Sequence, residues 1–271
     1  MKTYVINLER AERRRKYIVN HLTSLCLDFK IINAIDGNNL TEDDIYKCAD
    51  MERVKRSPYW LTKGAIACAL SHRKAYQEFV SSGDSFAFII EDDVQLPNNI
   101  NMILDEVSSV MTDKDISLLY YTSLKPKTFS TIGAKKLSIG SLYYPIETPG
   151  SAAAYIIGKV AASNLISKIM PIRAAADSWQ HFYKIGSFES FMVHYPPTVK
   201  TMNFKSSIDY HDNRPFLAKC LSAIDKYKIP IAYQLITYRR IRNLNKMLNH
   251  FSLTDKISPI YIDVQKKKTM A

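Results

Sequence analysis

Short apolar runs alternate with stretches of helical spacing along the first two thirds of the chain. Runs of this kind build buried strands, whereas apolar residues at three- and four-residue steps indicate helices packed on a core. We predict strands over residues 4–8, 29–35, 86–90, 116–121, 151–157 and 188–195. We predict helices over residues 10–25, 63–82, 100–111 and 159–170. Strands that alternate with helices are typical of parallel βαβ units, so the expected class is an α/β sheet covered on both faces.

Polar residues mark where several of these elements begin and end. Thr62 is placed to cap the helix from Lys63, and Gly83 to end it. Thr41, followed three residues later by Asp44, has the pattern of a capping box that opens another short helix. Residues 129–144 have a looser pattern, which we interpret as a hairpin. Beyond Asn213 the pattern is helical throughout.

Positive charge is concentrated in the last quarter of the chain. Residues 1–212 contain 25 Lys and Arg against 23 Asp and Glu, a balance of +2, whereas residues 213–271 contain 12 against 3, a balance of +9. We therefore expect two regions, an α/β catalytic domain over 1–212 and a helical basic extension over 213–271.

The basic extension contains an amphipathic pattern. Its apolar residues recur at helical spacing: Leu235, Tyr238, Ile241, Leu244, Leu248 and Phe251. Arg239, Arg242 and Lys246 project to the other side, and Lys266–Lys268 follow. This pattern favours binding to the surface of an anionic membrane. The alternative is a helix that packs on the catalytic domain and leaves its basic face in solvent. No nucleic-acid motif accompanies the charge, so nucleic acid is not an expected partner.

The compartment follows from what the sequence lacks. No run approaches the 18 or so apolar residues of a membrane span, and the apolar part of the N-terminus is short for a signal peptide. The four cysteines have no paired spacing, which is typical of reduced thiols. We expect a cytoplasmic protein, peripheral on the inner face of the membrane.

Three consecutive acids, Glu91, Asp92 and Asp93, follow directly after the apolar run 86–90. A buried strand would deliver them to its C-terminal edge, where open α/β sheets bind ligands. Adjacent carboxylates repel one another unless a cation lies among them, and hard oxygen ligands suit Mg²⁺ or Mn²⁺ together with substrate phosphates. The sequence therefore indicates a metal site for a phosphorylated substrate. The alternative is a solvated turn that caps the next helix.

Six segments, in order, resemble glycosyltransferase family 25, the lipooligosaccharide-type transferases of bacteria. They are VINLERAER (5–13), AIDG (34–37), GAIACALSH (64–72), IIEDDV (89–94), GSAAAYII (150–157) and ADSW (176–179). Ala67 replaces the Gly that is usual in the family, and Ala176 replaces Val. The resemblance covers about residues 3–210 and does not include the basic extension.

The resemblance implies a GT-A-like (Rossmann-like) nucleotide-diphospho-sugar transferase fold. It also implies inverting transfer of a hexose, most often galactose, from a UDP-sugar to a lipooligosaccharide or lipopolysaccharide glycan, with Mn²⁺ or Mg²⁺ as cofactor. Glu91 and Asp93 resemble the outer carboxylates of a DxD pattern, with Asp93 the direct metal ligand. If the segment is extended, Asp92 points elsewhere, toward the ribose or the donor sugar.

Other residues are candidates for contact with the nucleotide. Asn7, Arg10 and Arg13 follow the first strand, and Asp36 ends the second. Ser71 and His72 lie within the long helix. For the arginines the alternative is a solvated helix face, for Asp36 a turn, and for His72 a structural hydrogen bond.

Inversion needs a base for the acceptor hydroxyl, and Asp177 fits by its position before a helix. Glu189 is the rival base, and the alternative role of Asp177 is to cap its helix. Trp179 could stack on a sugar. His194 or His211 could supply a third metal ligand, although each is expected to be a surface histidine.

Two other functions remain open at this point. A metal-dependent phosphohydrolase or nucleotidyltransferase could use the same carboxylates. Within the transferase interpretation, UDP-glucose or a UDP-N-acetylhexosamine could replace UDP-galactose as donor. A non-enzymatic membrane or nucleic-acid adaptor would instead make the basic extension the functional part.

Overall fold

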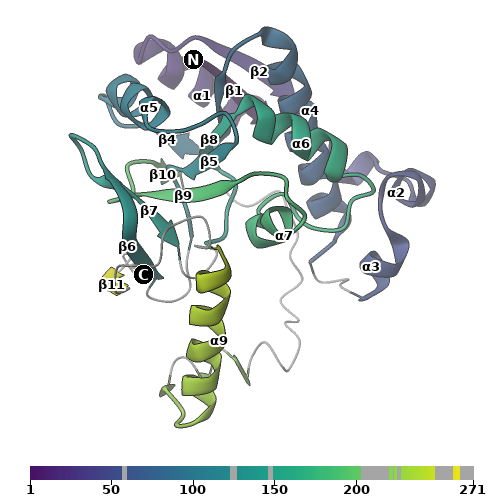
Figure 1. Ribbon diagram of the computed structural model, residues 1–271. Helices are drawn as coiled ribbons and strands as arrows, with labels where there is room; N and C mark the ends of the chain where they lie inside the picture. Colours follow the sequence, from purple (N-terminus) through teal and green to yellow (C-terminus); the bar gives the residue numbers. More distant parts are fainter. Residues whose placement is uncertain are drawn as a thin grey trace, which may run out of the picture.

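The computed structural model describes residues 1–56, 60–122, 127–145, 149–202, 220–221, 223–224, 227–247 and 259–262. These residues form one mixed sheet with helices on both faces, and a two-stranded ribbon beside it (Figure 1). The sheet has the strand order β11-β6-β7-β9-β5-β8-β3-β1-β2. The α/β class predicted from the pattern of runs is confirmed.

The strand bounds follow the apolar runs closely in the first half of the chain. The sheet contains β1 (Lys2–Asn7), β2 (Phe29–Asn33), β3 (Phe86–Glu91), β5 (Asp115–Leu118), β6 (Lys127–Lys136), β7 (Ser141–Pro145), β8 (Ala154–Gly158), β9 (Ser190–Tyr195) and β11 (Pro259–Ile262). The ribbon pairs β4 (Val94–Gln95) with β10 (Lys200–Thr201). The hairpin expected over 129–144 is β6 and β7.

The sheet contains the parallel pairs expected of βαβ units, but it also contains antiparallel pairs outside the predicted hairpin. β1 is parallel to β2 and β3, and β5 is parallel to β9, but β8 lies between β3 and β5 and is antiparallel to both. Ala154, the first residue of β8, pairs with Ile90 near the end of β3, and Gly158 pairs with Phe86. The chain thus enters β8 at the edge where β3 ends, so no crossover helix is needed. This places the segment before β8 beside the acidic triplet.

Helices cover the sheet on both sides, because each central strand buries alternate residues in opposite directions (Figure 1). They are α1 (Glu12–Ser24), α2 (Glu42–Cys48), α3 (Met51–Arg56), α4 (Lys63–Ser82), α5 (Ile100–Ser109), α6 (Lys159–Lys168), α7 (Trp179–Lys184) and α9 (Ala232–Met247). Ile89 packs in the core with α4, α6 and α7, whereas its neighbour Ile90 packs in the core with α1 and α5.

Local capping fixes the helix that forms one wall of the site. The Thr62 side chain accepts from the backbone N–H of Ala65, and Gly83 ends α4 with a φ of 88°. The predicted capping box of Thr41 and Asp44 is also present at α2. Each of these predictions is confirmed, because caps of this kind depend on a few neighbouring residues.

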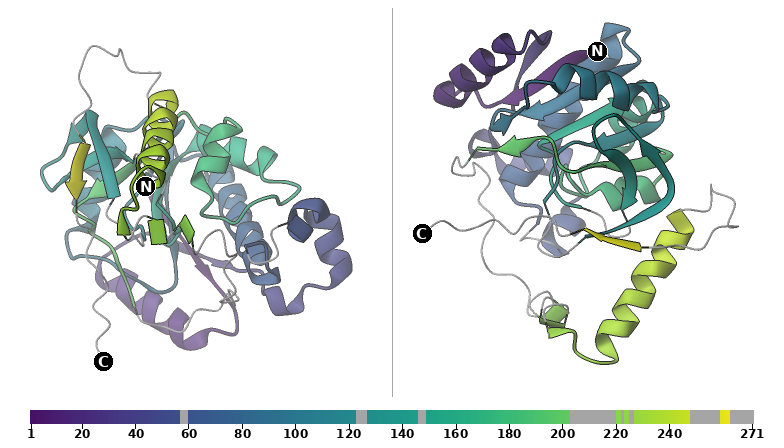
Figure 2. Two further views of the ribbon diagram at one scale, coloured as in Figure 1. Left: turned by 90° about the horizontal axis from the view of Figure 1, so that it is seen from below. Right: turned by 90° about the vertical axis from the view of Figure 1, so that its left-hand side faces the viewer.

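The C-terminal part is not wholly helical as predicted. α9 projects from the body of the molecule (Figure 2), but Pro259–Ile262 form β11, which pairs antiparallel with β6 at the edge of the sheet. The predicted positions Leu248, Phe251 and Lys266–Lys268 lie outside the described residues. Of the helices that the structure describes, none combines the length and the apolar character of a membrane span.

Candidate active site

A cavity of about 950 Å³ opens at the edge of the sheet where β1 and β3 end. Its walls come from the loop after β2, the first half of α4, the acidic triplet, the segment before β8 and the segment before α7. Glu91, Asp92, Asp93 and Asp177 all line it. The position is the one expected for ligands of an open α/β sheet. Carboxylates that are far apart in the sequence therefore share one cavity.

The acidic triplet is not extended throughout. β3 ends at Glu91, and Asp92 and Asp93 form a turn before β4. The side chains of these acids therefore do not alternate between two faces, as they would in an extended strand. Asp92 and Asp93 instead contact the same guanidinium group, that of Arg14. The Arg14 Nη2 atom lies 2.6 Å from Asp92 Oδ1 and 3.2 Å from Asp93 Oδ2.

Asp92 is held by the protein on both of its oxygens. The Asn7 amide donates to Asp92 Oδ2 at 2.6 Å, and Arg14 occupies Oδ1. The prediction that Asp92 points away toward a ribose or donor sugar is therefore not supported by these contacts. Asn7, predicted to contact the nucleotide, instead positions the turn that carries Asp93.

One oxygen of Asp93 receives no hydrogen bond from the part of the chain that the structure describes. Its Oδ1 atom is buried and has no hydrogen-bond partner among the residues described. Burial, and then the charge of Glu91, raise the pKa of Asp93 to about 6, although Arg14 acts in the opposite direction. A buried carboxylate oxygen of this kind is costly unless a cation or donor approaches it. This oxygen fits the divalent cation that the resemblance implies.

A second layer of contacts fixes the turn. The Met202 backbone N–H donates to the Asp93 carbonyl at 2.7 Å, directly after β10 pairs with β4. The Tyr120 hydroxyl lies 3.0 Å from Thr201 Oγ1, and both residues line the cavity. Tyr120, Thr201 and Arg14 were not among the predicted site residues. The position of Tyr120 near the C-terminal end of the predicted strand 116–121 was the available signal for it.

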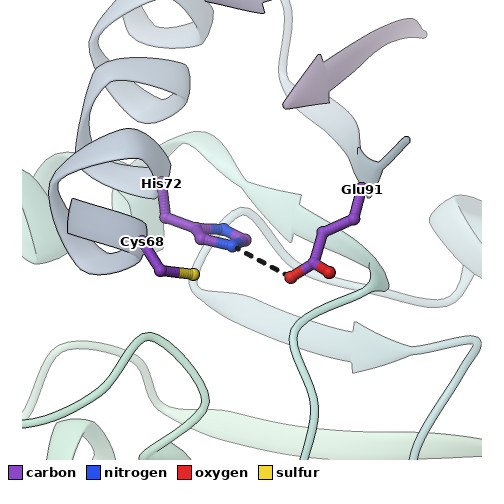
Figure 3. A group of neighbouring side chains, drawn as sticks. All are labelled: Cys68, His72 and Glu91. Atoms are coloured by element: carbon purple, nitrogen blue, oxygen red, sulfur yellow. Dashed lines mark ion pairs between the residues drawn. The ribbon is translucent and has the colours of Figure 1, made fainter. Parts of the chain in front are cut away.

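Glu91 faces α4 rather than the other two acids. Its Oε1 atom lies 3.7 Å from His72 Nε2, and Cys68 lies beside them (Figure 3). His72 is fully buried, and its Nδ1 atom is 2.8 Å from the Tyr155 hydroxyl. Burial, then the charges of Glu91 and Asp177, hold the pKa of the Cys68 thiol well above its usual range. Both carboxylates therefore act on the same half-buried thiol.

Ser71 has a structural role on the cavity wall. Its hydroxyl donates to the Ala67 carbonyl at 2.7 Å and accepts from the Ile35 N–H at 2.8 Å. These bonds join α4 to the loop that follows β2. Ser71 and His72 were predicted to contact the nucleotide, but their hydrogen bonds in the structure are to other protein groups.

Arg10 and Arg13 were the predicted cavity arginines, but Arg14 is the arginine of this segment that lines the cavity. Arg13 is exposed and does not line the cavity, whereas Arg14 does. Arg10 is exposed and pairs with Asp36, whose Oδ1 atom also accepts from the Asn38 N–H at 3.0 Å. The hydrogen bond from Arg10 is the main cause that lowers the pKa of Asp36. Asp36 lines the cavity as a permanently charged carboxylate near neutral pH.

Asp177 does not cap α7. The cap position is Ser178, and the Asp177 Oδ2 atom instead accepts from the Ser151 N–H at 3.0 Å across the cavity edge. Trp179 is fully buried, donates from Nε1 to the Ser151 carbonyl at 3.0 Å and packs edge-on against Tyr155. The predicted stacking of Trp179 on a sugar is therefore wrong. Trp179 and Asp177 together hold the segment before β8.

The remaining candidates lie away from the cavity. Glu189 is exposed and pairs with Lys114 at 2.8 Å. His194 is not a surface residue as predicted: it is fully buried, with its ring nitrogens 3.0 and 2.8 Å from the carbonyls of Pro196 and Ile139. Neither residue lines the cavity. His211 lies outside the described residues.

Comparison with known proteins identifies the family. The sequence model "Glycosyltransferase family 25 (LPS biosynthesis protein)" matches residues 1–179, and the chain belongs to this family. The family membership and the mixed α/β sheet together confirm the resemblance and the GT-A-like class that it implied.

Individual relatives are distant and much longer. Procollagen galactosyltransferase 2 of Homo sapiens is 24% identical over 185 residues, which are 63% of this chain and 28% of that protein. Procollagen galactosyltransferase 1 of Danio rerio is 25% identical over 72% of this chain and 33% of its own. The "Probable inactive glycosyltransferase 25 family member 3" of Rattus norvegicus is 29% identical over 42% of this chain and 21% of its own. The chain thus spans about a fifth to a third of these relatives.

One solved structure similar to this chain is a glycosyltransferase involved in glycosylation of the major capsid of PBCV-1. It aligns with a TM-score of 0.41 and 11% identity, over 76% of this chain and 94% of its own.

Proposed function

We propose that this chain is an inverting glycosyltransferase that moves a hexose, galactose in the first instance, from a UDP-sugar to a lipooligosaccharide or lipopolysaccharide glycan. The observation that carries the proposal is the shared cavity: in a member of family 25, Asp93 with its unsatisfied oxygen and Asp177 line the same 950 Å³ space. One carboxylate suits a cation at a diphosphate, and the other suits a base at the acceptor.

Asp93 is the residue that would hold Mn²⁺ or Mg²⁺, whereas Glu91, the second ligand predicted, faces Cys68 and His72 on α4. The ion, when bound, supplies positive charge that stabilises the diphosphate leaving group. Arg14 and Asn7 fix the turn so that Asp93 Oδ1 remains directed away from its protein partners. Asp36, in the loop after β2 that lines the cavity, offers an acceptor for a ribose hydroxyl or the uracil N–H.

Asp177 is the proposed base. During transfer the acceptor oxygen bonds to the anomeric carbon, the bond from that carbon to UDP breaks, and the hydroxyl proton passes to Asp177. The Ser151 N–H holds one carboxylate oxygen, which orients the other without using a charged partner. Glu189 is a poor rival, since it lies outside the cavity and pairs with Lys114.

We also propose that α9 brings the enzyme to the cytoplasmic face of an anionic membrane, where a glycolipid acceptor is presented. Leu235 and Tyr238 are 63% and 66% exposed, and Arg239 and Arg242 are exposed beside them. The alternative, in which this apolar face packs on the catalytic domain, does not agree with that exposure. Apolar and basic side chains together are suited to an interface with lipid.

The deciding experiment is a panel of UDP-sugars incubated with the full chain, Mn²⁺ and oligosaccharide acceptors. Free UDP and glycosylated product are both measured. UDP-galactose is expected to give the fastest acceptor-dependent release of UDP, with UDP-glucose and UDP-N-acetylhexosamines slower. Release of inorganic phosphate or UMP would favour a phosphohydrolase or nucleotidyltransferase. No turnover with any donor would place the chain with the relatives described as inactive.

A further inference from the structure

Three potential metal ligands of different chemistry meet at one point of the cavity wall. Cys68 and His72 are four residues apart, so they lie on the same face of α4, and Glu91 ends β3 opposite them (Figure 3). The Cys68 thiol, a ring nitrogen of His72 and a Glu91 carboxylate oxygen all lie within 4.8 Å of one another. Two helical ligands at this spacing and one from elsewhere are a common way to build a metal site.

The His72 ring provides independent evidence for a ligand. His72 is fully buried, and its Nε2 atom has no hydrogen-bond partner in the described part of the chain. The 3.7 Å separation from Glu91 Oε1 is too long for a hydrogen bond. A buried polar atom without a partner is rare and calls for an explanation, such as an ion.

Residues behind His72 orient the ring as they do at metal sites. The Nδ1 atom is 2.8 Å from the Tyr155 hydroxyl, which is 2.7 Å from the Tyr76 hydroxyl. When Nδ1 donates to Tyr155, the lone pair of the imidazole is on Nε2 and directed at Glu91 and Cys68. A hydrogen bond from the second nitrogen is the usual support for a metal-bound histidine.

The spacing of the ligand atoms is near that of a tetrahedral site. Two ligands at about 2.1 Å from a common tetrahedral ion are roughly 3.4 Å apart. The separation of 3.7 Å between His72 Nε2 and Glu91 Oε1 is close to that value. Because the three ligand atoms lie within 4.8 Å of one another, the Cys68 and Glu91 side chains would need to move by no more than roughly an ångström to bind one ion.

We propose that Cys68, His72 and Glu91 form a binding site for a transition-metal ion of the zinc type, separate from the all-oxygen site proposed at Asp93. Sulfur and imidazole select Zn²⁺ or Co²⁺ over Mg²⁺ and Ca²⁺. Cys68 and Glu91 line the cavity, so the fourth coordination position faces the space for substrate. Three protein ligands with an open position are typical of zinc that binds water or a substrate oxygen.

Cobalt is the probe that tests this site in the intact protein. The full chain, freed of metal by chelation, is titrated with Co²⁺ and followed by its absorption spectrum. One equivalent is expected to give a thiolate-to-cobalt charge-transfer band and the strong visible bands of four-coordinate cobalt, and Zn²⁺ should remove both. An ion at Asp93 has only oxygen ligands and gives no thiolate band.

Matched variants locate the sulfur. Cys68→Ser should abolish the charge-transfer band, and Glu91→Gln should weaken Co²⁺ binding about tenfold or more. Cys48→Ser is the control, because Cys48 is a half-buried free thiol of α2 that does not line the cavity. A thiolate band that survives in Cys68→Ser, or no band at millimolar Co²⁺, would overturn the proposal.

A second measurement needs no variant and so does not depend on whether the variants fold. Alkylation of the wild-type thiols is followed by mass spectrometry with and without Zn²⁺. Zn²⁺ should slow the modification of Cys68 at least tenfold, Mn²⁺ should have no effect, and the exposed Cys26 should react equally throughout. Equal alkylation of Cys68 with and without saturating Zn²⁺ would also reject the site.

Discussion

The cavity and α9 concentrate charge of opposite sign in different physical surroundings. In the cavity the side chains of Arg14, Asp92 and Asp93 are 16%, 7% and 20% exposed, and each carboxylate has a defined neighbour. On α9 the side chains of Arg239 and Arg242 are exposed, and Leu235 beside them is 63% exposed.

This contrast determines how much any single residue contributes. Charges shielded from water interact strongly, and their pKa values shift, as that of Asp93 does. Exposed charges are screened within about 8 Å at physiological salt, so each adds little. We therefore expect large effects from single substitutions in the cavity and small, cumulative, salt-sensitive effects on α9.

The largest effect is expected for Asp93→Asn. The substitution removes the charge that would hold the cation but keeps the size of the side chain. Sugar transfer with Mn²⁺ should fall by roughly two orders of magnitude or more, comparable to the loss of a major electrostatic stabiliser. Initial rates of UDP release at several Mn²⁺ concentrations measure this.

Asp105→Asn is the matched control, because Asp105 is exposed on α5 and does not line the cavity. It should leave the rate unchanged. Full activity of Asp93→Asn, or full activity of the wild type in excess EDTA, would exclude a metal role for Asp93.

A slightly smaller effect is expected for Asp177→Asn. Asparagine can still accept from the Ser151 N–H, so the segment before β8 should remain in place. It cannot take a proton near neutral pH, so kcat should fall about a hundredfold while the KM for the donor stays nearly constant. Steady-state kinetics in donor and acceptor separate the two parameters.

Glu189→Gln serves as the control, since Glu189 is exposed and pairs with Lys114 outside the cavity. Its kinetics should match those of the wild type. If Asp177→Asn instead loses donor affinity with kcat preserved, Asp177 binds the donor and the base is another residue.

The sequence predicted those features that depend on near neighbours. The capped helix from Lys63 and the strand that ends at Glu91 follow from runs and caps of a few residues. The direction of β8 was not predictable in this way. It depends on the end of the sheet at which the chain lies after the β6–β7 hairpin, and local sequence does not determine that position. β11 was missed because its partner, β6, is more than a hundred residues away.

The sequence predicted several of the residues that line the site, but not which partners those residues contact. The triplet and Asp177 were identified by position, but Arg14 was overlooked in favour of Arg13, since a run of arginines does not show which one faces the sheet. The fate of Trp179 depended on Tyr155 and Ser151, which are distant in sequence. Tertiary partners of this kind decide whether a polar or aromatic residue is structural or available to a ligand.

The third prediction concerns stability rather than activity. The pKa of Asp93 in the folded protein is about 6, above its usual 3.8, so the ionised carboxylate costs folding free energy above pH 6. In chelator, Asp93→Asn should therefore be more stable than the wild type near pH 7.5, by roughly 1–3 kcal/mol. The difference should shrink as pH falls through 6, because the wild type then gains its proton in the folded state.

Urea unfolding of both proteins between pH 5 and 8 measures this difference. Asp105→Asn should follow the wild type at every pH. A gap that does not change with pH, or an Asp93→Asn protein that is less stable at pH 7.5, would show that the cavity does not penalise this charge.

The smallest effect is expected on α9. Each Lys or Arg near an anionic bilayer contributes about 1 kcal/mol, so Arg239→Gln should weaken binding to anionic vesicles roughly fivefold at low salt. Lys16→Gln, which removes an exposed charge from α1 on the body of the molecule, should have no effect. Transfer to a small soluble acceptor should be equal in both variants, because neither residue lines the cavity.

Vesicle flotation at low and physiological salt is the measurement. If the full chain does not float with anionic vesicles even at low salt, the exposed face of α9 serves another purpose, and the acceptor reaches the cavity without help from the membrane.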